Sequence, residues 1–175
     1  MKPTAERVRE LLSYDPATGL FIWKYREGGP LRWNTKWAGK VAGSPHSGGY
    51  IAIAIDRVKY LAHHLAWVYM TGEWPESFID HKNLNKKDNV WENLRLASFG
   101  ENSANASIRN DNKSGFRGVH FIKSRNVWHA KLNKDGKEHY IGAFASAEEA
   151  ALAYAEKAKE VYGAYCPQYL LEMAA

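Results

Sequence analysis

The pattern of apolar and polar positions predicts many short helices and strands rather than a few long elements. Apolar residues spaced three or four apart indicate amphipathic helices, whereas strict alternation indicates strands. In the first half, helical spacing covers residues 3–13 and 62–70, and strand character covers 20–25, 50–55 and 58–61. Because Asp56-Arg57 separates the last two segments, they are expected to pair as a β-hairpin. Glycine and proline recur from Arg26 to Gly49 and predict an irregular segment there.

The pattern changes after a polar stretch, rich in structure-breaking residues, at 106–114. Three segments with strand character follow, at 118–122, 127–132 and 139–144, and the last two flank the strong turn Asn133-Lys134-Asp135-Gly136-Lys137. Ser146 and Glu149 form a capping-box pattern, so a helix is expected from there to about Tyr162. This order indicates a three-stranded antiparallel sheet packed on one alanine-rich helix.

Composition narrows the classes of function. The 175 residues include 24 Lys and Arg against 19 Asp and Glu, and the net charge of +5 favours a polyanionic partner. The single cysteine, Cys166, excludes an internal disulfide and a cysteine-rich zinc site. The N-terminal residues lack the apolar core of a signal peptide, and no uncharged apolar run has the length of a membrane span. We therefore expect a soluble protein of the cytoplasm, in a host cell if it is phage-encoded.

The positive charge is concentrated in the expected sheet. Residues 109–142 contain eight Lys and Arg against three Asp and Glu, whereas the helical segment 146–162 contains two against four. A basic sheet backed by a slightly acidic helix leaves one sheet face available to phosphates. A solvated surface sheet without a ligand has the same asymmetry, so charge alone leaves both interpretations open.

Candidate chemistry lies in the stretch Phe78–Asn105. Asp80, at the end of a short apolar run, is a hard oxygen ligand for a divalent ion, and His81 titrates near neutral pH, which suits a base that takes a proton from water. Asn93 follows after a polar loop and is a candidate to hold His81 or the loop by hydrogen bonds. Asn102, expected in the first turns of a short helix, is a candidate second metal ligand. Oxygen donors without cysteine favour Mg²⁺ or Mn²⁺ over Zn²⁺.

The same residues also have a purely structural interpretation. An Asp-His pair followed by an Asn-rich loop is typical of turn and helix-cap chemistry, so the residues alone leave a metal site and a structural loop equally open. His63 and His64 project about 100° apart on a helix and are not expected to share a metal. One of them is expected to pack or contact DNA, and the other to face solvent.

The order of these motifs resembles a nuclease family. The segments Ala62-His63-His64-Leu65-Ala66-Trp67, Ile79-Asp80-His81, Asp88-Asn89, Asn93-Leu94-Arg95, Asn102 and Asn105 are similar to HNH homing endonucleases of phages and introns, in the subgroup whose final motif residue is asparagine. The resemblance implies a ββα-metal fold. It also implies the roles of individual residues: Asp80 and Asn102 hold one Mg²⁺ or Mn²⁺, His81 is the general base, and Asn93 orients it.

Two positions depart from this family pattern. His64 stands where arginine is commoner, and Val90-Trp91 follows Asn89 where arginine often does. Because neither position carries the implied chemistry, the departures affect DNA contacts rather than cleavage.

The C-terminal segment has a second resemblance. Residues 114–119, 128–132, 140–144 and 147–154 are similar to the Apetala-two DNA-binding domain of plant ethylene-response factors, which lays its three-stranded sheet in the major groove. The resemblance implies six DNA contacts by position: Arg117, His120, Lys123, Arg125, Trp128 and Lys131.

Together these features predict an α+β protein with a ββα-metal HNH nuclease domain followed by a three-stranded antiparallel sheet packed on one helix. The expected parts are an endonuclease domain at 1–108 with its core at about 76–106, a linker at 109–113, an Apetala-two-type domain at 114–167 and a C-terminal tail at 168–175.

The expected function is site-specific hydrolysis of phosphodiester bonds in double-stranded DNA, by nicking or double-strand cleavage, with a monomer as the working assumption. Water activated by His81 would attack the phosphorus, and the metal would stabilise the leaving 3′ oxygen. One alternative is a sequence-specific DNA-binding regulator with a degenerate nuclease site. Another is an RNA-binding protein.

Overall fold

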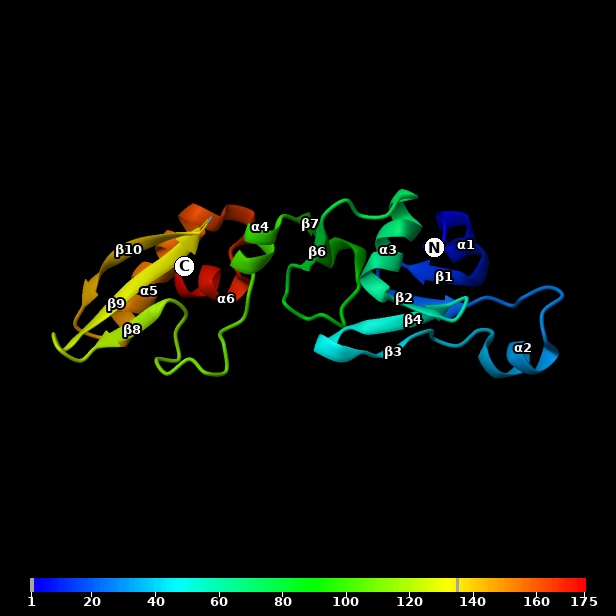
Figure 1. Ribbon diagram of the computed structural model, residues 1–175, viewed down its shortest axis with the longest axis horizontal. Coiled ribbons are helices and arrows are strands. Elements are labelled where there is room, and N and C mark those ends of the chain that lie inside the picture. The colour runs from blue at the N-terminus through cyan, green and yellow to red at the C-terminus, as the bar shows by residue number, and fades with distance from the viewer. Residues whose placement is uncertain (1, 135) are drawn as a thin grey trace. The chain divides into compact units, whose positions relative to one another are not determined.

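The computed structural model describes residues 2–134 and 136–175 and divides into two compact units, each with its own hydrophobic core (Figure 1). The first unit comprises the chain up to His81 together with Asn85–Leu96, and the second comprises Lys82–Leu84 together with Ala97–Ala175. The functional division at residues 108 and 114 stays a prediction. Among the described residues, no helix has both the length and the apolar character needed to cross a membrane.

The first unit is built from short elements and three small sheets. Its helices and strands, in chain order, are α1 Ala5–Leu11, β1 Leu12–Asp15, β2 Leu20–Trp23, α2 Leu31–Trp37, β3 Ser44–Pro45, η1 Ser47–Gly49, β4 Ile51–Ile55, β5 Val58–Leu61, α3 Ala62–Thr71, β6 Phe78–His81, η2 Trp91–Asn93 and β7 Leu94–Ala97. The sheets pair β1 with β2, β3 with β4 and β5, and β6 with β7. Most of them are ribbons too small to be stable alone, so packing against α1 and α3 must stabilise them.

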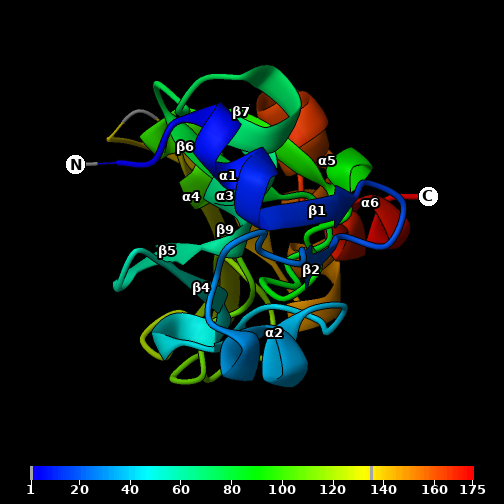
Figure 2. The same cartoon turned by 90° about the vertical axis from the view of Figure 1, so that its right-hand side faces the viewer.

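The core of the first unit lies between α1, α3 and the sheets. Val8 of α1 and Leu65 and Val68 of α3 are completely buried there, and Phe21 of β2 is almost so. The Thr4 hydroxyl accepts a hydrogen bond from the Arg7 amide at 3.2 Å and begins α1. The view in Figure 2 shows α2 away from α1 and α3, which agrees with Figure 1. From α2, Trp33 still packs against this core, with its ring 5.5 Å from that of Trp23.

Sequence patterns predicted the hairpin and α3 correctly. Asp56 and Arg57 both have positive φ angles of 48° and 69°, as a two-residue type I′ hairpin turn requires. Gly72, with φ of 88°, ends α3 where the sequence predicted its end. All three residues lie at positions where the left-handed conformation sets the direction of the chain.

Two expectations for the first unit were wrong. The helix expected over residues 3–13 ends at Leu11, because Leu12–Asp15 pairs instead with Leu20–Trp23 in an antiparallel ribbon. The segment expected to be irregular contains α2, which begins after Pro30 and has no glycine or proline inside it. The Asn34 side chain bonds both the amide and the carbonyl of Arg26, which anchors this short helix.

The second unit combines one sheet with three α-helices and one short 3-10 helix among its described residues. Its elements are α4 Phe99–Ala104, β8 Val119–Ile122, β9 Val127–Lys134, β10 Lys137–Phe144, α5 Ala147–Tyr162, η3 Gly163–Tyr165 and α6 Gln168–Met173. The sheet is antiparallel in the order β10-β9-β8, and α5 lies behind it in Figure 1. The predicted sheet backed by one helix is thus confirmed, whereas Asp135 of the predicted turn lies outside the described residues.

Alanines let α5 approach the sheet closely. Ala150, Ala155 and Ala158 are completely buried, and they pack in one cluster with Val119 and Leu132 of the sheet. The Ser146 hydroxyl accepts from the Glu149 amide at 3.1 Å, which confirms the predicted helix start. Residues 168–175, expected as a tail, contain α6, whose buried Leu170 joins the same core.

Candidate functional site

Asp80 and His81 lie at the end of β6, inside the first unit. Each residue is only 4% exposed, and Ile79 before them belongs to the hydrophobic core. Pairing of β6 with β7 holds this strand end in the unit. The two residues therefore lie in a largely desolvated setting, where charge is costly unless it is compensated.

Arg95 of β7 compensates the Asp80 carboxylate. Its Nε and Nη2 atoms lie 2.8 and 2.7 Å from the same oxygen, Oδ2 of Asp80. The side chains are 15% and 5% exposed, so this is a nearly buried ion pair. Charge-assisted hydrogen bonds of this kind fix the carboxylate in direction as well as in charge. The sequence placed Arg95 in a motif without assigning it a role.

His81 contacts Asn89, a residue to which the sequence pattern assigned no role. The Nε2 atom of His81 lies 3.4 Å from the amide oxygen of Asn89, and Asn93 donates from Nδ2 to the Asp88 carbonyl at 2.8 Å. Asn89 is itself held, because its carbonyl accepts from the Tyr14 hydroxyl at 2.6 Å. Asn93 thus stabilises the loop, one of its two expected roles, while Asn89 contacts the imidazole.

Burial lowers the pKa of His81 below its ordinary value. The hydrogen bond with Asn89 and the charges of Asp80 and Asp88 oppose this effect, and Lys86 adds to it. Since burial is the largest cause, the side chain is a neutral imidazole at neutral pH, which is the form that accepts a proton.

Two further aromatic side chains pack around His81. The rings of His63 and His81 are 5.0 Å apart at 83°, and Tyr50 lies 5.0 Å from His63. Burial, followed by the electrostatic influence of the neighbouring His64 and His81, lowers the pKa of His63 to about 3. His63 is therefore a neutral packing residue, as one histidine of the pair was expected to be.

His64 does not face solvent as expected. It is half-buried, its ring lies 4.4 Å from that of His63, and it also packs against Trp74. The side chains of neighbouring helix residues leave the backbone in different directions, but the rings of His63 and His64 are large enough to contact each other.

The loop after His81 shows the turn chemistry of the structural interpretation. The Asn85 and Asp88 side chains accept from the amides of Lys87 and Val90, both at 3.2 Å. A Cβ atom at Gly19 would overlap the backbone at Asn89, so the β1–β2 turn lies directly against this loop. The loop residues are structural, and the chemical groups remain those at its two ends.

Asn102 lies on α4 in the second unit, whereas Asp80, His81 and Asn93 lie in the first. A capping box fixes the first turn of α4: the Ser98 amide donates to Glu101 at 2.7 Å, and the Glu101 amide donates to the Ser98 hydroxyl at 3.3 Å. Asn102 continues this turn, with its amide 2.9 Å from the Ser98 carbonyl. Among the described residues, no three His, Cys, Asp or Glu side chains form a metal-binding group.

The register of the second unit's sheet decides which predicted DNA contacts share a face. His120 pairs with His129, and Lys131 pairs with Tyr140, on the face opposite α5. The His129 and Tyr140 rings are 5.2 Å apart there. We call the side chains of His120, His129, Lys131 and Tyr140 the open face. Sequence reasoning missed His129 and Tyr140, which alternation along the expected strands could have placed.

Three other predicted contacts lie elsewhere. Lys123 and Arg125 are exposed in the turn between β8 and β9. Trp128 pairs with Phe121 on the α5 side, where it is half-buried against the core, so it is not on the open face.

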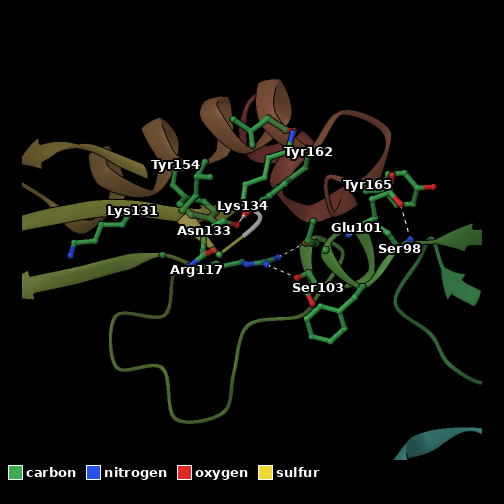
Figure 3. Close-up of a pocket in the computed structure, with 17 residues that line it drawn as sticks. Ser98, Glu101, Ser103, Arg117, Lys131, Asn133, Lys134, Tyr154, Tyr162 and Tyr165 are labelled. Atoms are coloured by element: carbon green, nitrogen blue, oxygen red, sulfur yellow. Dashed lines mark hydrogen bonds between the residues drawn. The ribbon is translucent and has the colours of Figure 1, made fainter. Parts of the chain in front are cut away.

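Arg117 also lies off the open face. Its guanidinium is directed at the end of α4 (Figure 3). Arg117 and Trp128 thus lie off the open face, because their side chains pack within the unit, and their expected contacts with DNA stay a prediction.

Comparison with known proteins relates the central stretch of the chain to a protein family. Residues 60–104 match the family model of an HNH endonuclease. The chain is 30% identical over 149 residues to Uncharacterized HNH endonuclease L560 of Acanthamoeba polyphaga mimivirus, covering 84% of this chain and 73% of that protein. It is 31% identical over 104 residues to Protein 3.8 of Escherichia phage T7, covering 59% and 85%. No solved structure matches.

Proposed function

Because the chain belongs to the HNH endonuclease family, we propose that it is a metal-dependent, site-specific DNA endonuclease of the homing type. The observation that carries the proposal is the buried pair at the end of β6, in which Arg95 compensates Asp80 and His81 is kept neutral beside it. A neutral imidazole next to a fixed carboxylate combines a proton acceptor with an oxygen ligand.

His81 is the proposed general base. In the neutral form it takes a proton from the water that attacks the scissile phosphorus, and the contact with Asn89 restricts the orientation of its ring. The Tyr14 hydroxyl and the bonds of Asn93 and Asp88 restrict the loop in turn. Limited motion of the base shortens the search for a reactive geometry, which is how positioning contributes to rate.

The donor set suits Mg²⁺ or Mn²⁺. Asp80 and Asn102 offer a carboxylate and an amide oxygen, and magnesium sites use few protein ligands because water and substrate phosphates complete them. We propose that strands β6 and β7 and helix α4 form a ββα-metal core with these two ligands. When bound, the ion stabilises negative charge on the scissile phosphate and on the leaving 3′ oxygen.

The second unit is the proposed DNA-binding part, of the Apetala-two type. His120 and Lys131 offer hydrogen-bond donors on the open face, where Lys131 also pairs with Glu138 at 2.9 Å, and Lys123 and Arg125 extend the positive charge into the adjacent turn. A strand ribbon or small sheet fits the major groove, where base edges are distinguished. If this sheet selects the DNA sequence, the buried pair of the first unit can act on any phosphodiester bond that is presented to it.

One specific observation favours a second function. Arg95 donates twice to Oδ2 of Asp80, an oxygen that a metal ion would use, so an intact ion pair fits a DNA-binding regulator that does not cleave. Such a protein would bind DNA with strong salt dependence and would not respond to divalent ions.

Cleavage of DNA from the gene's own genomic neighbourhood tests the proposal. We expect cut ends at one or a few mapped positions with Mg²⁺ or Mn²⁺, and none with a chelator or with Asp80→Ala. The control is Asp111→Ala, because Asp111 is an exposed carboxylate paired with Arg109 in the second unit. Salt-sensitive binding without any cut ends would support the regulator instead.

A further inference from the structure

The guanidinium of Arg117 is bonded to the backbone at the end of α4 (Figure 3). Its Nη1 donates to the carbonyls of Ala104 at 2.6 Å and Ala106 at 3.1 Å, and its Nη2 donates to the Ser103 carbonyl at 2.9 Å. The Tyr169 hydroxyl of α6 donates to the Ala106 carbonyl as well, at 3.2 Å. These contacts direct the side chain into its own unit instead of toward a ligand.

The contacts answer a physical need of α4. The last carbonyls of any helix have no partner within the helix, and a cation there also interacts favourably with the helix dipole. Helix α4 has only six residues, which is too short to be stable without tertiary support. The Ser98–Glu101 capping box supports its beginning, and Arg117 supports its end.

The other end of the Arg117 side chain is fixed to the sheet. The next residue, Gly118, has φ of 70° and lies so close to Tyr154 and to the Lys131 carbonyl that a Cβ atom would overlap both. Its own carbonyl accepts from the Lys131 amide at 2.9 Å. The Tyr162 ring lies 5.9 Å from the guanidinium carbon of Arg117. The backbone at Arg117 is therefore locked between β9 and α5.

We propose that Arg117 is a positioning residue that couples the DNA-binding sheet to α4 and thereby holds Asn102, and that it is not a DNA contact. This inference rests on the proposed function, because Asn102 matters for cleavage only if it holds the metal. It gives the second unit two tasks: its open face meets DNA, and its rigid edge holds a residue of the cutting site in place.

Hydrogen exchange of the full-length protein tests the coupling without any reaction. In Arg117→Ala we expect the amides of Asn102 and Asn105, which bond within α4, to exchange at least about tenfold faster than in the wild type, since the end of the helix loses three hydrogen bonds. Arg117→Lys keeps the charge but lacks the guanidinium's fork of donors, so we expect faster exchange there too. The matched control is Arg125→Ala, which removes an exposed arginine in the turn between β8 and β9 and should leave α4 unchanged.

Measurements of DNA binding distinguish an arginine that contacts DNA from one that supports α4. For Arg117→Ala we expect the slope of log Kd against log salt to stay at the wild-type value, whereas Arg125→Ala should reduce it by about one for each phosphate that the protein no longer neutralises. At saturating DNA, Arg117→Ala should lower kcat by about tenfold or more and raise the Mg²⁺ concentration needed for half-maximal rate, as loss of groups that orient metal ligands does.

The opposite pattern would overturn the inference: unchanged exchange in α4 together with weaker binding and a reduced salt slope for Arg117→Ala. If Arg117→Ala does not fold, as judged by circular dichroism, Arg117→Lys decides in the same way. If the wild type cleaves no DNA, the proposed function fails, but exchange and salt slope still show whether Arg117 supports α4 or contacts DNA.

Discussion

Single side chains at the end of β6 show how burial of charge shapes this protein. The Asp80 side chain is paired in the interior with Arg95, which donates twice to one of its oxygens, whereas His81 avoids charge by staying neutral. His63, packed against His81, is neutral for the same reason. One buried site thus contains an ion pair beside two uncharged imidazoles.

Acid should destabilise the protein through His63. In the unfolded chain this histidine binds a proton near pH 6.5, whereas in the folded protein it does so only at about pH 3. Between these values the unfolded state binds the proton and the folded state does not, so stability falls as the pH falls. Each pH unit below 6.5 lowers the free energy of unfolding by about 1.4 kcal/mol, so the total loss at pH 4.5 is about 2.7 kcal/mol.

Replacement by an apolar residue isolates this contribution. We expect His63→Leu to lose less free energy of unfolding than the wild type between pH 6.5 and 4.5, as measured by urea titration at each pH. His139→Leu is the control, because His139 is exposed on β10. Equal pH dependence in His63→Leu and the wild type would mean that His63 is protonated in the folded state.

Residue roles were partly predictable from the sequence. Asp80 and His81 stood out because a carboxylate and an imidazole end an apolar run. Asn89 and Arg95 did not, since their contacts depend on the path of the loop and on the pairing of β6 with β7, which no local pattern encodes. The hydrogen bonds of Arg117 to the end of α4 were not predicted, because a basic residue beside a basic sheet is equally compatible with a DNA contact and with support of a helix end.

Among the elements, the close approach of β8 and α5 depends on Gly118. A Cβ atom there would overlap the Tyr154 ring and the Lys131 carbonyl, and φ of 70° is already unfavourable for other residues. We expect Gly118→Ala to lower the free energy of unfolding by about 2–5 kcal/mol, from overpacking and backbone strain together. Chemical denaturation followed by tryptophan fluorescence measures this.

Gly136→Ala is the matched control for that substitution. Gly136 has a similar φ of 75°, but an added Cβ would meet no described atom within 4 Å. Gly136→Ala should therefore lower the free energy of unfolding through backbone strain alone, by about 1–2 kcal/mol. Equal losses in the two variants would show that close packing at Gly118 contributes nothing.

Periodicity predicted those elements that bury one face against their own unit. The β4–β5 hairpin, α3, the three strands of the second sheet and α5 all follow from local spacing and turn residues. Strand β1 was taken for the end of a helix, because its apolar residues also fit helical spacing until Leu12 pairs with Trp23. Helix α2 was missed because nearby glycines and prolines suggested a loop throughout.

Over the whole molecule, the residues proposed for cleavage come from both compact units. Asp80, His81 and Asn93 belong to the first, and Asn102 belongs to the second together with the open face and Arg117. Under the proposed function the second unit therefore supplies a metal ligand as well as a DNA-binding sheet. Sequence order suggested a simple division into a cutting part and a binding part, whereas α4 belongs to the same compact unit as the sheet.

The most direct test of the proposed endonuclease is the single-turnover rate of DNA cleavage in Mg²⁺ for the wild type, His81→Ala and His139→Ala. We expect cleavage by the wild type, a loss of about 10²–10⁴-fold in His81→Ala, because a general base is removed, and a wild-type rate in the exposed-histidine control. Cleavage by His81→Ala at the wild-type rate would contradict it, because the buried imidazole would then have no part in the reaction.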